Sequence, residues 1–418
     1  MKPNILILLT VIAITLGSRT EAQTYDTNNE VVQTFAGSGF SGYVDGVGQS
    51  TMFNNPNAIV ADSHSNLFVW DSGNYRIRKI APDGTVTTFA GGGSNAQGTG
   101  TNVNLTTYGI NALAIDRSNT LWAVTGPGVD WLYKISSGAV ATYTNFSSIS
   151  GTLMGVCADS VGNIYISSAN NRIYRYATNT VLSVFAGSGN SGYADGNGIF
   201  TAFNSPAALA IDSADNIYVW DSGNHLIRKI DQSQNVTTIA GNYGSPYAAN
   251  ADGIGTNAVF YSISQMAVDN SGNVIMASAV PGSSIRKMDA SSNVVTIAGS
   301  FSQRGYTNGA GNLAAFNMVS GVCVSQGSIF VADTGNQRIR YITNNPQPQI
   351  VTGANLGIGT YAGVTITGTV GRTYQVQSSP DLNAWTTRAT LLLNSSPYLW
   401  IDQSPIAGNK FYRALLLP

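Results

Sequence analysis

Residues 35–80, FAGSGFSGYVDGVGQSTMFNNPNAIVADSHSNLFVWDSGNYRIRKI, and residues 185–230, FAGSGNSGYADGNGIFTAFNSPAALAIDSADNIYVWDSGNHLIRKI, are two copies of one sequence. Without a gap, 29 of their 46 aligned positions are identical. Weaker copies lie between and after them. Internal similarity at a period of tens of residues is the signature of a repeat architecture, so we expect a fold built from copies of one small unit.

Each copy contains four short segments with strand-like sequence, separated by turn residues. We place the first strands, most of which end at an aspartate, at residues 57–62, 111–116, 154–159, 207–212, 264–269 and 320–325. The second strand is rich in aromatic residues, as in LFVW at Leu67 and IYVW at Ile217. A D-x-G-N turn then leads to a third strand such as RIRKI, and a fourth strand resembling VTTFAG follows. This pattern predicts a four-stranded antiparallel sheet.

The order of these strands predicts a closed ring of sheets. One such sheet cannot bury both of its faces, whereas sheets stacked radially cover one another, and only a closed ring leaves no end exposed. The earliest fourth-strand segment, residues 31–36, precedes every first strand, and the last copy ends at Ile342 without a fourth strand. We therefore predict an all-β, six-bladed β-propeller in which an N-terminal strand completes the last blade.

The repeat resembles the NHL repeat, in which P-x-x-[apolar]-A-x-D, a strand ending in Y-V-x-D, and G-N-x-x-I-R-K-[apolar] recur. The matching segments are residues 56–62, 66–71 and 73–80 in one copy and 206–212, 216–221 and 223–230 in another. The resemblance covers about residues 31–345, although the second, third and fifth copies lack the D-x-G-N turn. It implies a propeller, and it implies no single function, because fold and function separate easily.

The two ends of the chain differ from the repeats. Residues 1–22 combine Lys2 with a short apolar run and a T-E-A sequence, which predicts a signal peptide and an exported protein, secreted or at the cell surface. We expect the propeller over residues 23–345, a Pro/Gln linker over 346–350 and a small β-sandwich-like domain over 351–418. The sequence Y-x-V-x-x-S-x-D-L-x-x-W from Tyr374 resembles short C-terminal modules of exported bacterial proteins, so attachment to the cell surface through this domain stays open.

Composition argues against several classes of partner. The formal net charge is -1, so nothing indicates a nucleic acid or an acidic membrane surface as a partner. Charged residues make up only 10% of the chain, and 46 glycines supply turns, which is typical of an exported β protein. After residue 22 no segment has the run of about 20 apolar residues that a membrane-spanning helix needs.

Side chains that catalyse reactions or bind metals are scarce. The two histidines, His64 and His225, fall in turns at opposite ends of the strands, so they cannot share a metal. The NHL resemblance extends to lyases that need several histidines and to lactonase-like propellers that bind calcium at the channel. In this sequence the channel ends of the first strands carry Asn57, Asn111, Met154, Ala207, Ser264 and Ser320, none of them acidic. We predict no catalytic residue, no metal ligand and no cofactor.

Recurring charged residues and cysteines have structural interpretations. Aspartates that end the first strands should cap hairpin turns, and those that begin the D-x-G-N turns should order them; these are Asp62, Asp116, Asp159, Asp212 and Asp269, and Asp71, Asp221 and Asp333. We interpret the third-strand arginines, Arg78, Arg228, Arg286 and Arg340, as a solvated or blade-bridging row. Cys157 and Cys323 occupy one position of opposed copies, too far apart for a disulfide, and should be buried thiols.

The loops between copies hold the candidate ligand-binding residues. Four loops share a D-G-x-G-like core and end in a phenylalanine expected to pack onto the blade: Phe53, Phe203, Phe260 or Phe316. We expect these loops and the D-x-G-N turns on one face, where aromatic and carboxylate groups suit a sugar or a peptide. The candidates are Tyr43, Asp45, Trp70, Trp131, Tyr193, Asp195, Trp220 and Asp252. Two alternatives stay open: the tryptophans at 70 and 220 fill gaps in the blades, and the loop aspartates bind calcium.

These observations predict a non-catalytic extracellular scaffold that presents a loop-rich propeller face to a protein, peptide or glycan. The alternative is a metal-dependent lyase or lactone hydrolase with its site at the mouth of the propeller channel.

Overall fold

The computed structural model describes residues 30–344, except 94–97, 104, 106–108, 127–130, 137–138, 146–148, 150 and 245–249. Beyond them it describes residues 363–366, 369, 372–380, 383–392, 398–401 and 411–416. The expected signal peptide lies outside these ranges. The chain divides into two compact units, Met1–Asn344 and Asn345–Pro418. Within the described ranges, no helix has the length and hydropathy needed to cross a membrane.

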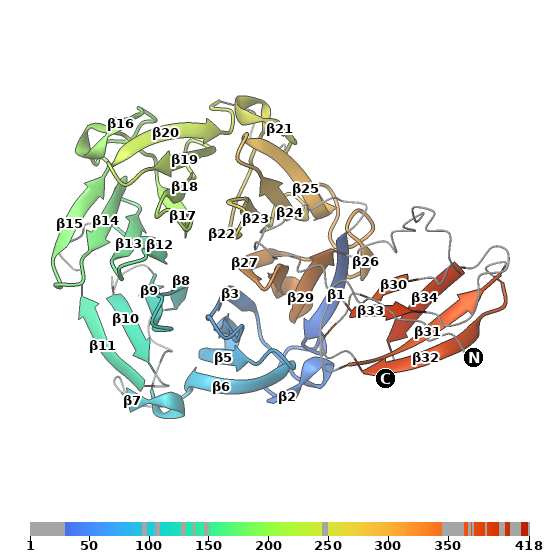
Figure 1. The fold of residues 1–418 in the computed structure, drawn as a ribbon. Coiled ribbons are helices and arrows are strands. Elements are labelled where there is room, and N and C mark those ends of the chain that lie inside the picture. The colour runs from blue at the N-terminus through green and yellow to red at the C-terminus, as the bar shows by residue number, and fades with distance from the viewer. Residues whose placement is uncertain are drawn as a thin grey trace, which may run out of the picture. The chain divides into compact units, whose positions relative to one another are not determined.

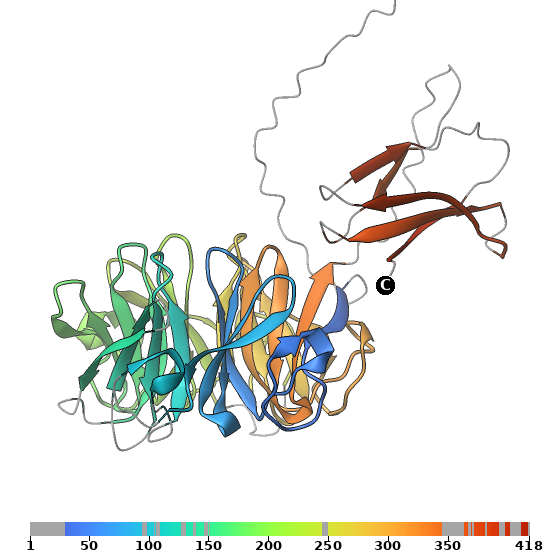
Figure 2. The same ribbon diagram turned by 90° about the horizontal axis from the view of Figure 1, so that it is seen from below.

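Six antiparallel sheets of the described residues surround a common centre in the first unit (Figure 1). The sheet nearest the N-terminus shows the plan. From the centre outward it consists of β3 (Pro56–Ala61), β4 (Leu67–Asp71), β5 (Arg76–Ile80) and β6 (Thr85–Gly91), with the short β2 (Gly46–Val47) at the outer edge. Figure 2 shows the ring from the side, as a disc whose strands run between its two faces.

The next four blades follow the same plan, and each again runs from an inner strand at the centre to an outer edge. The second contains β8 (Ile110–Ile115), β9 (Leu121–Thr125), β10 (Trp131–Ser136), β11 (Ala139–Asn145) and β7 (Gly98–Thr99). The third contains β12 (Leu153–Ala158), β13 (Ile164–Ser168), β14 (Arg172–Tyr176) and β15 (Leu182–Ala186). The fourth contains β17 (Pro206–Ile211), β18 (Ile217–Asp221), β19 (Leu226–Ile230), β20 (Asn235–Ala240) and β16 (Gly196–Asn197). The fifth contains β22 (Gln265–Val268), β23 (Val274–Ser278), β24 (Ser283–Met288), β25 (Asn293–Ser300) and β21 (Gly253–Ile254).

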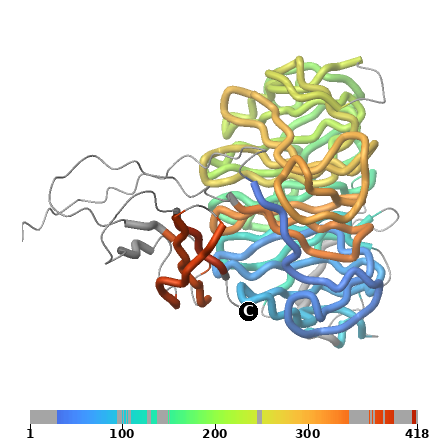
Figure 3. The backbone as a smooth tube through the Cα atoms, turned by 90° about the vertical axis from the view of Figure 1, so that its right-hand side faces the viewer, coloured from blue at the N-terminus to red at the C-terminus, as the bar shows by residue number. Residues whose placement is uncertain are grey.

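The N-terminal strand closes the ring. In the sixth sheet β1 (Glu30–Ala36) pairs antiparallel with β29 (Arg338–Asn344), with Val32 opposite Ile342. The rest of that sheet is β27 (Val319–Ser325), β28 (Ser328–Asp333) and the edge strand β26 (Gly309–Ala310). Figure 3 shows β1, in dark blue, beside the orange strands of this blade. The predicted completion of the last blade by the N-terminal segment is therefore confirmed.

The hydrophobic core lies between neighbouring blades, as radial stacking requires. Phe68 and Trp70 of the first blade pack in one cluster with Leu121 and Ala123 of the second. Second strands such as β4 and β18 are buried along their whole length because both of their faces are covered. This explains why the sequences of these strands are continuous runs of aromatic and β-branched residues, without alternating polar residues.

A glutamine side chain of the fifth blade forms hydrogen bonds to the inner strand of the first blade, across the sixth blade. Gln265 of the fifth blade reaches the backbone of Ile59 in the first: its Nε2 donates to the Ile59 carbonyl over 2.8 Å, and the Ile59 N–H donates to its Oε1 over 3.2 Å. The intervening Gly321 of the sixth blade makes this possible. A Cβ atom there would clash with the carbonyl oxygen of Asn57. The inner strand β27 packs against β3, which completes the circle of inner strands.

The second unit forms two small antiparallel sheets. One pairs β30 (Gly363–Ile366) with β33 (Tyr398–Ile401), and the other has the order β32 (Thr386–Leu392), β31 (Thr373–Ser379), β34 (Phe411–Leu416). Its described buried cluster consists of Ile366, Tyr374 and Val376. Tyr374 and Val376 belong to the Y-x-V pattern noted in the sequence, so these two positions of the pattern have a packing role.

Candidate functional site

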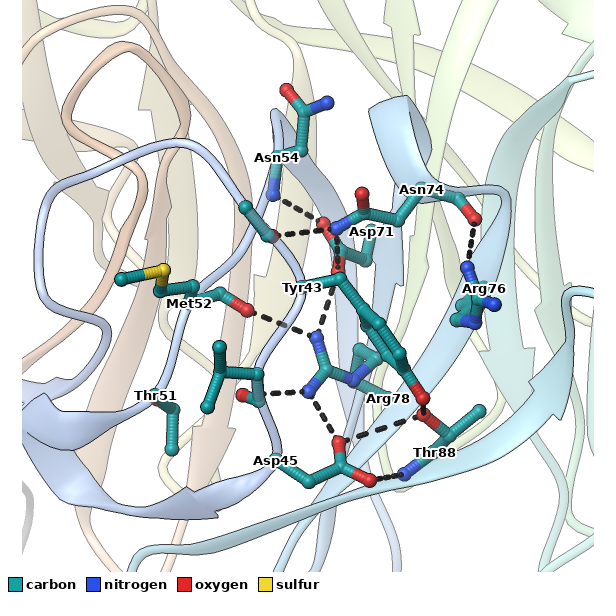
Figure 4. Close-up of polar contacts among 12 residues, drawn as sticks. Tyr43, Asp45, Thr51, Met52, Asn54, Asp71, Asn74, Arg76, Arg78 and Thr88 are labelled. Carbon is teal, nitrogen blue, oxygen red and sulfur yellow. Dashed lines mark hydrogen bonds and ion pairs between the residues drawn. The ribbon is translucent and has the colours of Figure 1, made fainter.

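A buried arginine joins two loops of the first blade (Figure 4). The Arg78 side chain on β5 is fully buried, and its Nη1 donates to Asp71 Oδ2 over 2.9 Å. Its Nη2 donates to Asp45 Oδ1 over 2.5 Å. The same two nitrogens donate to the carbonyls of Met52 and Val44 over 3.1 and 3.2 Å. One guanidinium thus fixes the D-G-x-G loop to the D-x-G-N turn through both charge and backbone hydrogen bonds.

The full arrangement recurs in the fourth blade, and parts of it recur in the sixth and the fifth. Arg228 pairs with Asp221 and Asp195 over 2.9 and 2.7 Å. Arg340 pairs with Asp333 over 2.7 Å and donates to the amide oxygen of Asn308, which stands in the place of the loop aspartate. Arg286 pairs with Asp252 over 3.0 Å. All four arginine side chains are buried within their own blades. Their interpretation as a solvated or blade-bridging row is therefore wrong, because each arginine pairs with at least one carboxylate of its own blade or of the loop that enters it.

Burial shifts the ionisation of the inner members of these clusters. Burial raises the pKa of Asp221 to about 6, because desolvation outweighs its hydrogen bonds from Asn204 and Asn224 and the charge of Arg228. Burial likewise raises the pKa of Asp71 and of Asp333, against the opposing effect of their own arginines. These carboxylates are structural, and each is enclosed by donors of its own blade.

The elevated pKa of Asp221 predicts a pH dependence of stability. Its pKa is about 6 in the folded protein against 3.8 for an ordinary aspartate, so the folded state binds this proton more tightly. Its contribution to the free energy of unfolding is therefore greatest below about pH 4, falls by about 3 kcal/mol as the pH rises through 6, and is constant above. Carboxyl ¹³C NMR should show the titration. The stability difference between the wild type and Asp221→Asn should shrink or reverse as pH rises, and a difference that grows with pH would contradict the prediction.

The turn-capping aspartates behave as predicted. Asp62 Oδ1 accepts hydrogen bonds from the N–H groups of His64 and Asn66 over 2.9 and 2.7 Å. Asp71 orders the D-x-G-N turn by accepting from the N–H of Asn54 and the side-chain amide of Asn74. The predicted packing of the loop phenylalanines is also confirmed, since all four side chains are buried. They are Phe53, Phe203, Phe260 and Phe316.

The predicted loop contacts lie along the outer edges of separate blades. Asp45 Oδ2 accepts from the N–H of Thr88 on the outermost long strand of the first blade, and the Tyr43 hydroxyl is 2.8 Å from Thr88 Oγ1. In the fourth blade Asp195 accepts from the N–H and the hydroxyl of Thr238, and the centre of the Tyr193 ring lies 4.1 Å from that of Tyr243. The first and fourth blades lie across the ring from one another (Figure 1). These residues therefore belong to separate blades, and their role as ligand contacts stays a prediction.

The calcium alternative for the loop aspartates finds no support in this geometry. Asp45, Asp195 and Asp252 each accept from a guanidinium and from a backbone N–H on the outermost long strand of the same blade. A guanidinium satisfies the same carboxylate oxygens that a calcium ion would need. In the described part of the chain, no three His, Cys, Asp or Glu side chains form a group that could hold a metal ion.

The tryptophans are less accessible than a ligand contact requires. Trp70 is 1% exposed and Trp220 is 2% exposed, and both belong to the clusters between blades. Their interpretation as ligand contacts is wrong, and the alternative that they fill gaps in the blades is confirmed. Trp131 is half-buried on β10, where its ring packs against Tyr133 with the ring centres 5.8 Å apart.

Histidines and cysteines occupy separate environments. His64 is exposed in a hairpin turn, whereas His225 is half-buried, with its Nδ1 3.1 Å from the carbonyl oxygen of Phe260. Both cysteines, Cys157 and Cys323, are buried free thiols, as predicted, and burial raises the pKa of each above its ordinary value. They are therefore protonated and poorly nucleophilic at neutral pH.

The central channel is the cavity that the inner strands of all six blades line together. Its volume is about 210 Å³, and its lining includes no Asp, Glu, Lys, Arg or His. The starts of the inner strands supply uncharged polar groups and a thioether, namely Asn57, Asn111, Ser264, Ser320 and Met154. The remaining wall consists mostly of Ala, Val, Ile and Leu together with the two cysteines. Such a lining can form hydrogen bonds to a neutral polar group, and it provides no general acid or base.

Two polar groups at this end of the channel are accessible. Asn111 is exposed, and its Nδ2 donates to the carbonyl of Leu153 over 2.8 Å, which holds the amide in place. Ser264 is also exposed. The neighbouring Gln265 is the residue that sequence reasoning missed, although it is a glutamine at a position where the other copies have Ala or Gly, and that departure was a usable signal.

Comparisons with known proteins agree with the repeat and the fold. Residues 203–230 and 316–340 match the NHL repeat family. In sequence the chain is similar to Protein SUPPRESSOR OF QUENCHING 1, chloroplastic, of Arabidopsis thaliana, with 26% identity over 328 residues. That alignment covers 74% of this chain and 27% of that protein, so the chain spans about a quarter of its relative's length.

Two crystal structures of proteins from Bacteroides thetaiotaomicron resemble the fold. One is a structural genomics protein of unknown function, with a TM-score of 0.60 and 21% identity, covering 75% of this chain and 76% of that chain. The other is an auxiliary nutrient binding protein, with a TM-score of 0.59 and 17% identity over the same shares of the two chains. At these identities the likeness concerns the fold.

Proposed function

This chain is an NHL-repeat β-propeller protein, and we propose that it serves as a non-catalytic extracellular binding scaffold. Its ligand is a neutral polar molecule, either a sugar or a peptide segment of a protein, bound at the channel end that carries Asn111 and Ser264. The observation that carries this proposal is the channel lining, in which every polar side chain is uncharged at neutral pH. Amide and hydroxyl groups above an apolar wall suit such ligands.

Two further observations support a binding role. The arginines and aspartates that recur in the blades are engaged with one another, so they are not available for acid–base chemistry on a substrate. A protein of the same fold is named an auxiliary nutrient binding protein, and binding is extended to this chain as part of the proposal. The extracellular location rests on the sequence of residues 1–22.

The test is a screen of glycan and peptide arrays, followed by titration calorimetry with the best ligand. Asn111→Ala is expected to weaken binding about fivefold to tenfold, the typical effect of one lost hydrogen bond. Asn190→Ala, an exposed asparagine in a loop of the fourth blade, is the control and should leave affinity unchanged. If both variants lost affinity equally, or if Asn111→Ala lost none, the channel end would not be the binding site.

A second measurement separates binding from metal-dependent catalysis. Metal analysis and thermal melts with and without a chelator should show a melting temperature that the chelator does not change. Stoichiometric metal whose removal lowers the melting temperature would contradict the non-catalytic proposal and favour a lyase or lactone hydrolase.

A further inference from the structure

The third blade differs from the others at its outer edge. In the five other blades a strand of two residues pairs outside the fourth long strand, as β2 does on β6 and β7 does on β11. The third sheet ends at β15, and in the described part of the chain nothing pairs with its outer side. Figure 1 shows β15 at the periphery of the ring.

The length of the connections explains this difference. The capping strand of each of the other blades comes from the connection that enters that blade; these connections are residues 37–55, 92–109, 187–205, 241–264 and 301–318. The connection into the third blade is residues 146–152, seven in all. Seven extended residues span at most about 25 Å. This connection is shorter than each of the five connections that supply an edge strand.

The exposed edge lacks the charged residues and prolines that protect many sheet edges. Val181 to Ala186, VLSVFA, contains no charge and no proline. In the first blade, Val86 and Thr88 direct their backbone N–H groups away from the sheet, toward the capping segment. Val86 pairs with Gly46, and the N–H of Thr88 donates to Asp45. The equivalent residues Leu182 and Val184 therefore direct their N–H groups outward. Ser183 between them is exposed, and Val181 is 53% exposed.

The third blade also lacks the buried arginine. Tyr174 stands where the first blade has Arg78; it is buried, and its hydroxyl accepts from the amide of Asn170 over 2.7 Å. The second blade likewise has a buried tyrosine, Tyr133, at this position, and its edge strand Gly98–Thr99 comes from a segment without an acid, QGTGTN. In the second blade, which has a tyrosine at the arginine position, the outer edge of β11 is therefore capped by an uncharged strand that contains glycine.

We propose that the outer edge of β15 is a docking site for an extended, uncharged, glycine-containing segment of another protein, added as an antiparallel strand. The described chain enters and leaves the propeller in the sixth blade, across the ring from the third (Figure 1), which favours a segment from a different molecule. Main-chain hydrogen bonds at Leu182 and Val184 give the affinity, and the absence of charge along the edge excludes charged segments. This site is separate from the channel end and does not depend on it.

Amide hydrogen exchange tests the proposal on the full chain. In the free protein the amides of Leu182 and Val184 should exchange about tenfold faster than those of Val86 and Thr88, because only the latter are capped. The probe is the synthetic peptide Gln-Gly-Thr-Gly-Thr-Asn in excess, which should slow exchange at Leu182 and Val184. The same peptide with lysine in place of its first glycine should have no effect.

Matched variants give the control. Ser183→Lys places a charge beside the open edge and should abolish the slowing by the peptide, whereas Thr87→Lys, the equivalent exposed position of the capped first blade, should leave it unchanged. Slowing that persists in Ser183→Lys would overturn the proposal. So would protection of Leu182 and Val184 in the dilute free protein. Protection that disappears on dilution would also overturn it, because a second copy of the chain would then occupy the edge.

Discussion

Replacing Arg228 by methionine is expected to lower the free energy of unfolding by about 3–5 kcal/mol. The Asp221 side chain is fully buried and lies 2.9 Å from the guanidinium, so the substitution leaves a buried carboxylate without its cation. The substitution also removes two hydrogen bonds from the guanidinium to the carbonyls of Ala202 and Ala194. These bonds hold the loop of residues 187–205 against the blade. Urea denaturation at neutral pH measures the loss.

Two further variants distinguish the lost ion pair from a general effect of mutation. Lys229→Ala changes the next residue of the same strand, where the ammonium lies 5.7 Å from the centre of the Tyr218 ring, and should cost no more than about 1 kcal/mol. The double variant Arg228→Met with Asp221→Asn should be more stable than Arg228→Met alone by about 2 kcal/mol, because it removes the uncompensated charge. Strictly additive effects in this cycle would contradict the assignment.

Deleting residues 1–36 is expected to lower the melting temperature by about 10 °C or more, or to prevent cooperative folding. The deletion removes β1 and with it the ladder to β29, along with the fully buried Val32 and Ala36. It opens the ring at the sixth blade and exposes the side of β29 that β1 covers. A propeller owes its stability to closure, because an open ring has two uncovered ends. Differential scanning calorimetry measures the effect.

The control for this deletion is the removal of residues 1–29, which leaves β1 intact. That variant should melt within about 2 °C of the full chain, since it keeps every strand of the ring. If the two deletions lowered the melting temperature equally, the loss could not be attributed to β1. If neither did so, closure by the N-terminal strand would contribute little to stability.

The repeat made the architecture predictable from sequence. The 46-residue copy with its strand and turn signals defined the blade, and the misplaced segment at residues 31–36 revealed how the last blade is completed. The capping roles of Asp62 and Asp71 were also readable, because a short acidic side chain before a turn bonds to nearby backbone N–H groups. These are local properties, and they require no knowledge of what lies on the next blade.

The candidate site was predicted less well, and the reason is again physical. Tyr43, Asp45 and the tryptophans looked like an accessible surface because aromatic and acidic residues at loop positions are typical of binding sites. The structure places Trp70 between two blades, whereas Tyr43 stays 43% exposed and the Asp45 side chain stays 44% exposed beside Arg78. Whether an aromatic ring faces solvent or a neighbouring sheet depends on the packing of residues far apart in sequence, and a periodic pattern carries no information about that.

The sequence by itself determined the all-β repeat, its strand order and the closure of the ring, because these follow from recurring short-range signals and from the need to cover every blade. Tertiary structure alone decided two other features: the burial of the arginines beside their aspartates and the burial of Trp70 and Trp220 between blades. Both result from side chains far apart in sequence that meet only in the folded protein, where a buried charge is stable only beside a partner that offsets its desolvation.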